Sequence, residues 1–185
     1  MRTLLAVFLF CNLALAQQSV RTVYLVRHAE KASNADNALL SPAGMKRAEC
    51  LANTLKDAGI KQIYVTNVER TQQTADPLAK ELKITPKILP PEDEASLVRD
   101  IFYNGSGNTL VVGHGNTLPV IIARMKAGKI PAIGDNDYGN LYVVTTMEGS
   151  VTPVITLHYC QNTSPAAATP HPTPHPATKK APAKK

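Results

Sequence analysis

The sequence predicts one α/β domain with a doubly wound, mostly parallel central sheet that is flanked by helices. Short apolar segments rich in Val, Ile and Leu alternate with longer segments that repeat apolar residues at helical spacing. The short segments contain few polar breaks, which is typical of parallel strands buried on both faces. The part between the two chain ends, residues 17–160, has the length of one domain with one good core.

Residues 1–16 are predicted to be a secretory signal peptide and not part of the domain. A short basic start is followed by an apolar run over 4–15, and Ala14-Leu15-Ala16 has the small-x-small pattern of a cleavage site before Gln17. This run is shorter than the about 20 residues that span a bilayer, so no transmembrane span is expected. The mature protein is expected to be periplasmic or secreted.

Residues 161–185 are predicted to be a disordered Pro/Ala/Thr/Lys-rich tail. They contain no large apolar side chain and end in lysines, so they lack the surface needed to form a core. The sequence pI of about 9.3 belongs largely to this tail, because residues 17–160 are nearly neutral. We expect loose association with anionic surface polymers and no nucleic-acid partner, since aromatic and base-reading side chains are not interleaved with the charges.

The first predicted strand, Thr22–Val26, ends directly at Arg27 and His28. After a polar loop, Ser41 is expected to cap a helix that begins at Pro42. That helix places apolar residues at three- and four-residue spacing on one face and ends at Gly59.

The second predicted strand is 62–66, and it runs directly into a helix with Arg70 near its start. A proline-rich loop and Glu92-Asp93-Glu94 then precede a short helix that ends at about Tyr103. The third strand, 109–112, ends in Gly113-His114-Gly115-Asn116-Thr117, where the glycines let the backbone approach a ligand and Asn116 or Thr117 caps another helix. Two final strands are expected at 141–146 and 151–158.

Three strand-to-helix junctions thus deliver Arg27, His28, Arg70 and His114 to one edge of the sheet, where open α/β sheets bind ligands. Two guanidinium groups and two imidazoles suit a phosphate dianion, and a histidine nucleophile allows phosphoryl transfer through a covalent phosphohistidine. The pair His28-x-Glu30 and His114 has no recognised metal spacing, so neither a metal nor another cofactor is expected. A serine hydrolase is disfavoured, because histidine stands where a nucleophile elbow needs serine.

Four motifs in this order resemble those of the histidine phosphatase (phosphoglycerate-mutase-like) superfamily. They are Leu25-Val26-Arg27-His28-Ala29-Glu30, Leu40-Ser41-x-x-Gly44-x-x-Arg47-Ala48, Arg70-Thr71-x-Gln73-Thr74-Ala75 and Val112-Gly113-His114-Gly115-Asn116. The resemblance implies that His28 is the phosphorylated nucleophile, that Arg27 and Arg70 bind the phosphate with Asn116 nearby, and that His114 completes the pocket.

This chain departs from the family pattern in two places. Ala29 follows the nucleophile where the family commonly has Gly, and the segment between Arg70 and His114 is too short for the cap of larger members. It therefore looks similar to the small, open branch that includes bacterial phosphohistidine phosphatases. An open site favours hydrolysis over a mutase reaction, because a mutase must protect its intermediate from water.

Family resemblance also implies a carboxylic acid between Arg70 and His114 that protonates the leaving group. Of the carboxylates there, those within helices are expected to face solvent, which leaves the loop carboxylates. Glu94, at the start of a helix, is the first candidate for the acid and Glu92 is the second. The alternative is a solvated acidic turn.

Two further expectations concern redox state and function. After signal removal, Cys50 and Cys160 remain. Two cysteines in an exported protein suggest a disulfide, and two separate buried thiols are the alternative that the sequence leaves open. The predicted function is phosphomonoester hydrolysis on a small phosphorylated substrate or a phosphoprotein. The alternative is a secreted phosphate- or glycan-binding module with a degenerate pocket.

Overall fold

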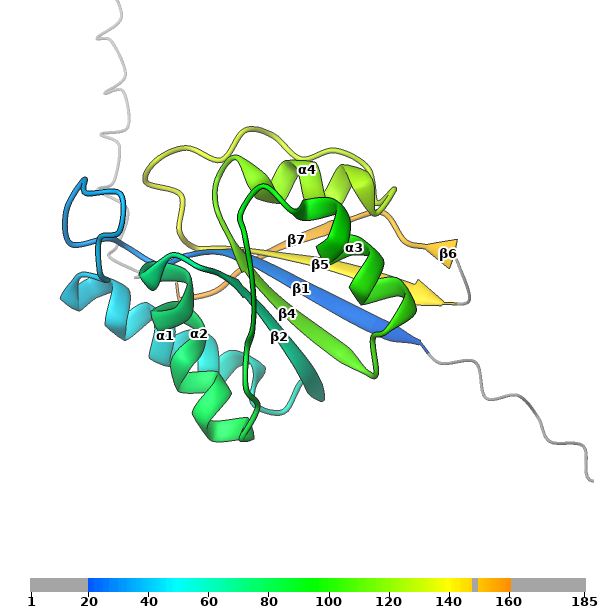
Figure 1. Ribbon diagram of the computed structural model, residues 1–185, viewed down its shortest axis with the longest axis horizontal. Helices are drawn as coiled ribbons and strands as arrows, with labels where there is room; N and C mark the ends of the chain where they lie inside the picture. Colours follow the sequence, from blue (N-terminus) through cyan, green and yellow to red (C-terminus); the bar gives the residue numbers. More distant parts are fainter. Residues whose placement is uncertain (1–19, 148–149, 161–185) are drawn as a thin grey trace, which may run out of the picture.

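In the computed structural model, which describes residues 20–147 and 150–160, helices and strands alternate along most of the chain (Figure 1). The predicted signal peptide and tail lie outside the described residues. The elements in chain order are β1 Arg21–Arg27, α1 Pro42–Leu55, β2 Ile60–Thr66, α2 Glu69–Leu82, β3 Lys87–Leu89, α3 Glu94–Tyr103, β4 Asn108–Gly113, α4 Thr117–Arg124, β5 Asn140–Met147, β6 Ser150–Val151 and β7 Ile155–His158.

The strands form one sheet of seven, in the order β3-β2-β4-β1-β5-β6, with β7 also pairing with β5. The first four are parallel to one another, and β5 is antiparallel to β1, as are β6 and β7 to β5. The predicted mixed α/β class with a mostly parallel sheet is confirmed. Because β1 and β4 are neighbours with β2 beside them, their carboxyl ends lie at one edge of the sheet.

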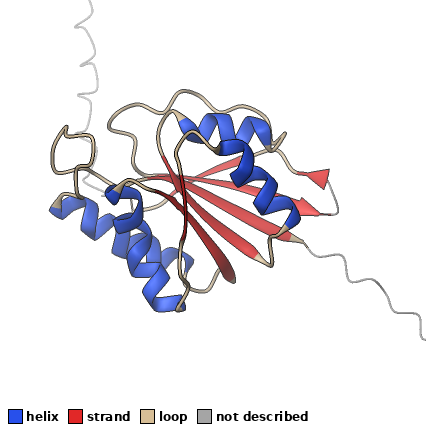
Figure 2. Cartoon of the chain, viewed as in Figure 1, coloured by secondary structure: helices blue, strands red, loops and turns tan. Residues whose placement is uncertain are grey.

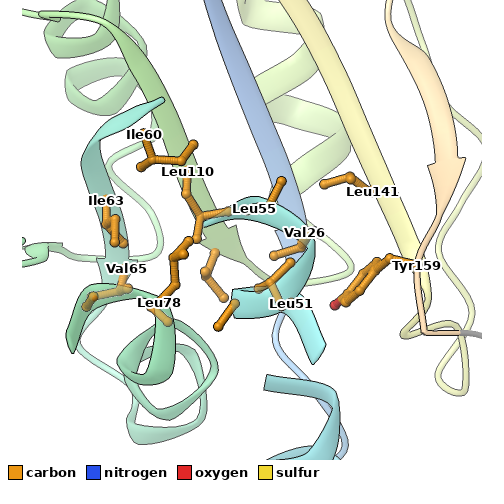
Figure 3. Packing of buried hydrophobic residues seen from close by; sticks show 14 residues of the cluster. Val26, Leu51, Leu55, Ile60, Ile63, Val65, Leu78, Leu110, Leu141 and Tyr159 are labelled. Atoms are coloured by element: carbon orange, nitrogen blue, oxygen red, sulfur yellow. The ribbon is translucent and has the colours of Figure 1, made fainter. Parts of the chain in front are cut away.

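Helices α1 and α2 cover one face of the sheet, and α3 and α4 cover the other (Figures 1 and 2). The pleat of each strand sends alternate side chains to the two layers. In β2, Ile63 and Val65 pack with Leu51 and Leu78 under α1 and α2 (Figure 3), while Tyr64 packs in the opposite layer. Both layers are apolar, which explains why the sequence shows uninterrupted apolar strands.

The predicted start of α1 is confirmed: the Ser41 side chain accepts a hydrogen bond from the Gly44 amide, and Pro42 is the first helical residue. Two sheet predictions needed correction. The proline loop contains the edge strand β3, and the last predicted strand is two short strands, β6 and β7. Pro153 separates them, since proline lacks the N–H that a continuous ladder requires.

A disulfide and a hydrogen bond fix the segment after β7 to α1, and an ion pair fixes the loop after β1 to the same helix. Cys50 and Cys160 form a disulfide across 110 residues of chain, which is one of the two states that the sequence left open. The Arg47 guanidinium binds both carboxylate oxygens of Glu30 at 2.7–2.9 Å and donates to the Cys160 carbonyl at 3.3 Å. In the described part of the chain, no helix has the length and apolar character needed to cross a membrane.

Candidate active site

The carboxyl ends of β1 and β4 bring the two predicted histidines together. Arg27 is paired in register with Gly113, and the His28 amide donates to the Gly113 carbonyl at 2.9 Å. The imidazole rings of His28 and His114 lie edge to face, with centroids 5.4 Å apart. They line an open cavity of about 830 Å³ whose wall also includes Arg27, Arg70 and Asn116. The four residues predicted from three strand ends are therefore neighbours.

His28 is held as a neutral ring with one nitrogen unused. Its Nδ1 lies 2.8 Å from the Ala29 carbonyl oxygen, and because a carbonyl only accepts, Nδ1 carries the proton and donates. Burial lowers the pKa of His28 to about 4, and the positive charges of Arg70 and Arg27 act in the same direction while the Ala29 hydrogen bond opposes them. At neutral pH the Nε2 lone pair is thus available as a nucleophile.

His114 is also neutral, but with the opposite tautomer. Arg70 Nη2 lies 3.4 Å from His114 Nδ1, and since a guanidinium only donates, this nitrogen accepts. The proton is then on Nε2, which lies 3.0 Å from the Thr66 hydroxyl oxygen. Burial, followed by the charges of Arg70 and Arg27, lowers the pKa of His114 to about 4. The Thr66 hydroxyl, at the end of β2, therefore orients the His114 ring. The sequence pattern indicated His114 through the motif around it but gave no indication of Thr66.

Both arginines keep a hydrogen-bond donor unused, and the carboxylate paired with Arg27 is long-range and fully exposed. The buried Nε–H groups of Arg27 and Arg70 have no acceptor among the described residues. Arg27 donates to the Gly134 carbonyl, lies over the Tyr138 ring at 4.7 Å, and is 3.9 Å from the fully exposed Asp135. Burial and the charge of Arg27 lower the pKa of Arg70. A bound anion with several oxygens would accept hydrogen bonds from the unused Nε–H groups and would offset the repulsion between the two guanidinium groups.

The backbone that carries His28 is fixed on its other side. The Ala29 amide donates to the Thr74 hydroxyl at 2.9 Å, and the Glu30 side chain is held by Arg47. A side chain at Gly44 would collide with the Glu30 carbonyl, so only glycine allows α1 to approach this closely. Gly44 and Arg47 of the second motif and Thr74 of the third therefore keep the loop that carries His28 in place.

The two glycines on either side of His114 have different neighbours. Gly115 packs against Arg27, where a Cβ would be 3.8 Å from the guanidinium carbon. At Gly113, a Cβ would instead press on Leu118 and Thr117 of α4. The Thr117 hydroxyl accepts from the His114 amide at 3.0 Å, while the Asn116 side chain makes no capping hydrogen bond and borders the cavity. Asn116 is thus open to a ligand.

The structure does not bring the predicted acids into this cavity. Glu94 borders a small apolar cavity beside α3 and α4, and Glu92 is exposed, although Pro91 of the same loop borders both cavities. Asp100 accepts hydrogen bonds from Tyr64 and Lys87, which lower its pKa to about 2. The carboxylate that does line the histidine cavity is Asp135, which lies outside the segment between Arg70 and His114.

Sequence reasoning also missed Lys31, Thr66 and Tyr138. Lys31 borders the cavity, and Tyr138 lies 6.2 Å from His28 between ring centroids. Tyr138 and Asp135 belong to an irregular loop whose sequence has no periodicity, and its Gly, Pro and Asp content indicated only a turn. Among the described residues, no cluster of three or more His, Cys, Asp or Glu side chains is arranged to hold a metal.

A cationic cavity with two neutral histidines, at the carboxyl edge of a doubly wound sheet, defines an α/β enzyme that acts on phosphate groups. Comparison with known proteins agrees. Residues 23–100, which include three of the four motifs, match the model of the histidine phosphatase superfamily (branch 1). Over residues 23–100 the chain is similar to the histidine phosphatase superfamily, and this similarity supports an enzyme that hydrolyses phosphomonoesters.

Solved structures share this fold at low identity. The protein histidine phosphatase SixA complexed with tungstate has 21% identity and a TM-score of 0.61, covering 74% of this chain and 96% of its own. A putative alpha-ribazole-5'-P phosphatase from Escherichia coli K-12 has 18% identity and a TM-score of 0.60, covering 75% and 96%. A mycobacterial glucosyl-3-phosphoglycerate phosphatase has 13% identity and a TM-score of 0.55, covering 69% and 91%. No match was found among curated proteins. The small, cap-less form of the chain is consistent with these neighbours.

Proposed function

We propose that the protein hydrolyses phosphomonoesters through a phosphohistidine formed on Nε2 of His28. One observation carries the proposal: the Ala29 carbonyl holds the Nδ1 proton, so the free lone pair of a neutral His28 lies in a cavity with two arginines whose Nε–H groups are unused. An imidazole is nucleophilic only in its neutral form, in which one nitrogen carries a lone pair. The hydrogen bond to Ala29 selects Nε2 as that nitrogen in His28.

In the first step, His28 Nε2 attacks phosphorus and the bond from phosphorus to the ester oxygen breaks. Arg27 and Arg70 stabilise the charge on the transferred oxygens, and a bound phosphate gives their unused donors an acceptor. Proton transfer from an acid releases the leaving group as an alcohol. In the second step, water attacks phosphorus, gives its proton back to that acid, and inorganic phosphate leaves with His28 restored.

His114 is proposed to act as a hydrogen-bonding partner of the transferred group. Binding of a dianion favours the protonated imidazolium, because opposite charge raises the pKa that burial and the arginines lower in the free site. Its Nδ1, which accepts from Arg70 in the free enzyme, then becomes a donor to a phosphate oxygen. Thr66 keeps the ring in place through Nε2 in both states.

Glu94 and Glu92 remain the predicted proton donors. Asp135 is a third candidate, because its carboxylate borders the cavity. Each is replaced in turn by its amide, and hydrolysis of an alkyl phosphate is compared with that of p-nitrophenyl phosphate. Replacing the true acid should reduce the rate of hydrolysis of the alkyl ester by about 10²-fold or more. The rate with the nitrophenyl ester should fall much less, because its leaving group needs little protonation. Equal small losses at all three positions would exclude them.

The test of the nucleophile is His28→Ala, with His158→Ala on the exposed strand β7 as the matched control. The first variant should lose turnover and the second should keep it. Acid-labile, base-stable phosphate should be recovered from quenched wild-type enzyme and not from His28→Ala. A protein that binds phosphate but turns over no aryl phosphate would instead be the binding module, and an active His28→Ala would refute the assignment.

We further propose that the enzyme is exported and that its basic tail associates loosely with anionic surface polymers. The sequence of residues 1–16 supports export, and the Cys50–Cys160 disulfide suits an oxidising compartment. The substrate would then be a small phosphorylated compound or a phosphoprotein outside the cytoplasm. Fractionation of producing cells tests this: full-length protein found only in the cytoplasm would contradict it.

A further inference from the structure

A second cavity, of about 410 Å³, opens beside the catalytic one. Three residues border both cavities: Arg27, Lys31 and Asp135. The rest of its polar wall consists of Ser33, Asn34 and Asn136, and Ala32 and Tyr138 complete the lining. A phosphate bound by Arg27 would therefore lie beside this second cavity.

Two loops form the cavity, and both are anchored by the backbone. The loop after β1 is closed by a bridge between Lys31 and Leu40 and by a hydrogen bond from the Ala32 amide to the Leu39 carbonyl at 2.8 Å. The loop before β5 contains a turn in which Gly134 and Asp137 exchange hydrogen bonds of 2.9 and 3.0 Å. Arg27 ties this turn to the catalytic cavity through the Gly134 carbonyl.

The charges that border both cavities restrict what can enter. Once a phosphate is bound by Arg27, the remaining charges there are those of Lys31 and Asp135, which are opposite in sign, so no net charge is left to favour a second anionic group or a cationic one. The remaining side chains are two amides and a hydroxyl, which both donate and accept hydrogen bonds. One face of the Tyr138 ring is already covered by the Arg27 guanidinium, which leaves less aromatic surface for stacking a flat base. A neutral group with several hydroxyls matches this wall.

We infer that the second cavity binds the leaving group of the substrate and that this group is uncharged and polyhydroxylated, as in a sugar phosphate. The inference rests on the proposed function, because it needs a phosphate held by Arg27 at His28. It adds the substrate class, which the catalytic residues alone do not specify.

The experiment compares two esters with similar carbon skeletons. Glucose 6-phosphate and cyclohexylmethyl phosphate both place a six-membered ring one carbon from the phosphate, but only the first carries hydroxyls. Wild-type kcat/KM should be at least about tenfold higher for glucose 6-phosphate, as expected from two or more net hydrogen bonds. Asn34→Ala and Asn136→Ala should each reduce that preference by about three- to tenfold.

The matched control is Asn53→Ala, an exposed asparagine on α1, which should keep the wild-type preference. The ratio of two kcat/KM values from one preparation does not depend on the fraction of folded enzyme, so partial unfolding of a variant cannot imitate the effect. Equal kcat/KM for the two esters, or an unchanged preference in both asparagine variants, would overturn the inference and leave hydrolysis intact. Preference for AMP or for a phosphohistidine peptide over glucose 6-phosphate would also overturn it. If wild-type enzyme hydrolyses neither ester nor p-nitrophenyl phosphate, the proposed function itself fails.

Discussion

Lowering the pH should leave the site histidines neutral well below the pH at which ordinary histidines become charged. Burial lowers the pKa of both His28 and His114 from 6.5 to about 4. At pH 5.5, an imidazole with a pKa of 6.5 is only about 9% neutral, whereas one with a pKa of about 4 is about 97% neutral. The nucleophile's contribution to kcat/KM should therefore be about tenfold greater at pH 5.5 than an ordinary histidine would allow.

Ring NMR of uniformly labelled protein measures both groups directly, with His28→Asn and His114→Asn supplying the assignments. The exposed His158 serves as an internal reference in the same sample. Inorganic phosphate should then raise the pKa of both buried rings, because a dianion favours the protonated forms. For the kinetic profile, kcat/KM must be corrected for the substrate, since phosphomonoesters themselves take up a proton near pH 6.

The same shifts fix the sign of the pH dependence of stability. A ring whose folded pKa is below its unfolded value disfavours proton binding in the folded state, so protons favour unfolding. The free energy of unfolding should be highest above about pH 6.5, fall as the pH decreases toward about 4, and level off below that. The difference between 6.5 and about 4 corresponds to about 3 kcal/mol for each ring. Titration of His28 or His114 near 6.5 in the free enzyme would refute the reasoning.

Three other changes have measurable outcomes. Replacing both Cys50 and Cys160 by serine should lower the free energy of unfolding by about 2–5 kcal/mol, because the disulfide closes a loop of 110 residues; no change in chemical denaturation would show that it adds nothing. Arg70→Lys should reduce kcat/KM far more than Lys56→Arg on the surface, since a point charge does not replace a planar fork, and equal values would exclude bidentate binding. Glu30→Gln should cost about 1–3 kcal/mol in thermal unfolding because Arg47 loses its charged partner, and an unchanged melting temperature would show that the pair is dispensable.

The sequence could place Arg27, His28 and His114 because each follows a buried strand without a gap. Once the strands are recognised, parallel order alone brings their carboxyl ends to one edge. Arg70 is predictable for a similar reason, since α2 begins only two residues after β2 ends. The site's catalytic half is therefore encoded by local patterns plus topology.

The rest of the site is built from loops, and local sequence patterns say little about where the residues of these loops lie. Strand β3 has three residues between prolines, too short for a period to show, and its ladder with β2 is a tertiary effect. Asp135 and Tyr138 reach Arg27 from more than 100 positions away in the chain, through contacts of a turn that no spacing rule describes. Pairs so far apart need a fold before they can be recognised.

The residues that position His28 and the residues of the loops have separate roles, so the phosphoryl-transfer step can stay the same while the preferred substrate changes. His28 is held by the Gly113 carbonyl, the Ala29 carbonyl and the close approach of α1, so a change there disturbs the nucleophile itself. Lys31, Asn34 and Asn136 are instead carried by irregular loops, and the side chains of Asn34 and Asn136 are exposed. Substitutions in these loops should alter which ester is preferred long before they alter stability or the transfer step. Substrate preference is therefore the property in which relatives with the same four motifs should differ most.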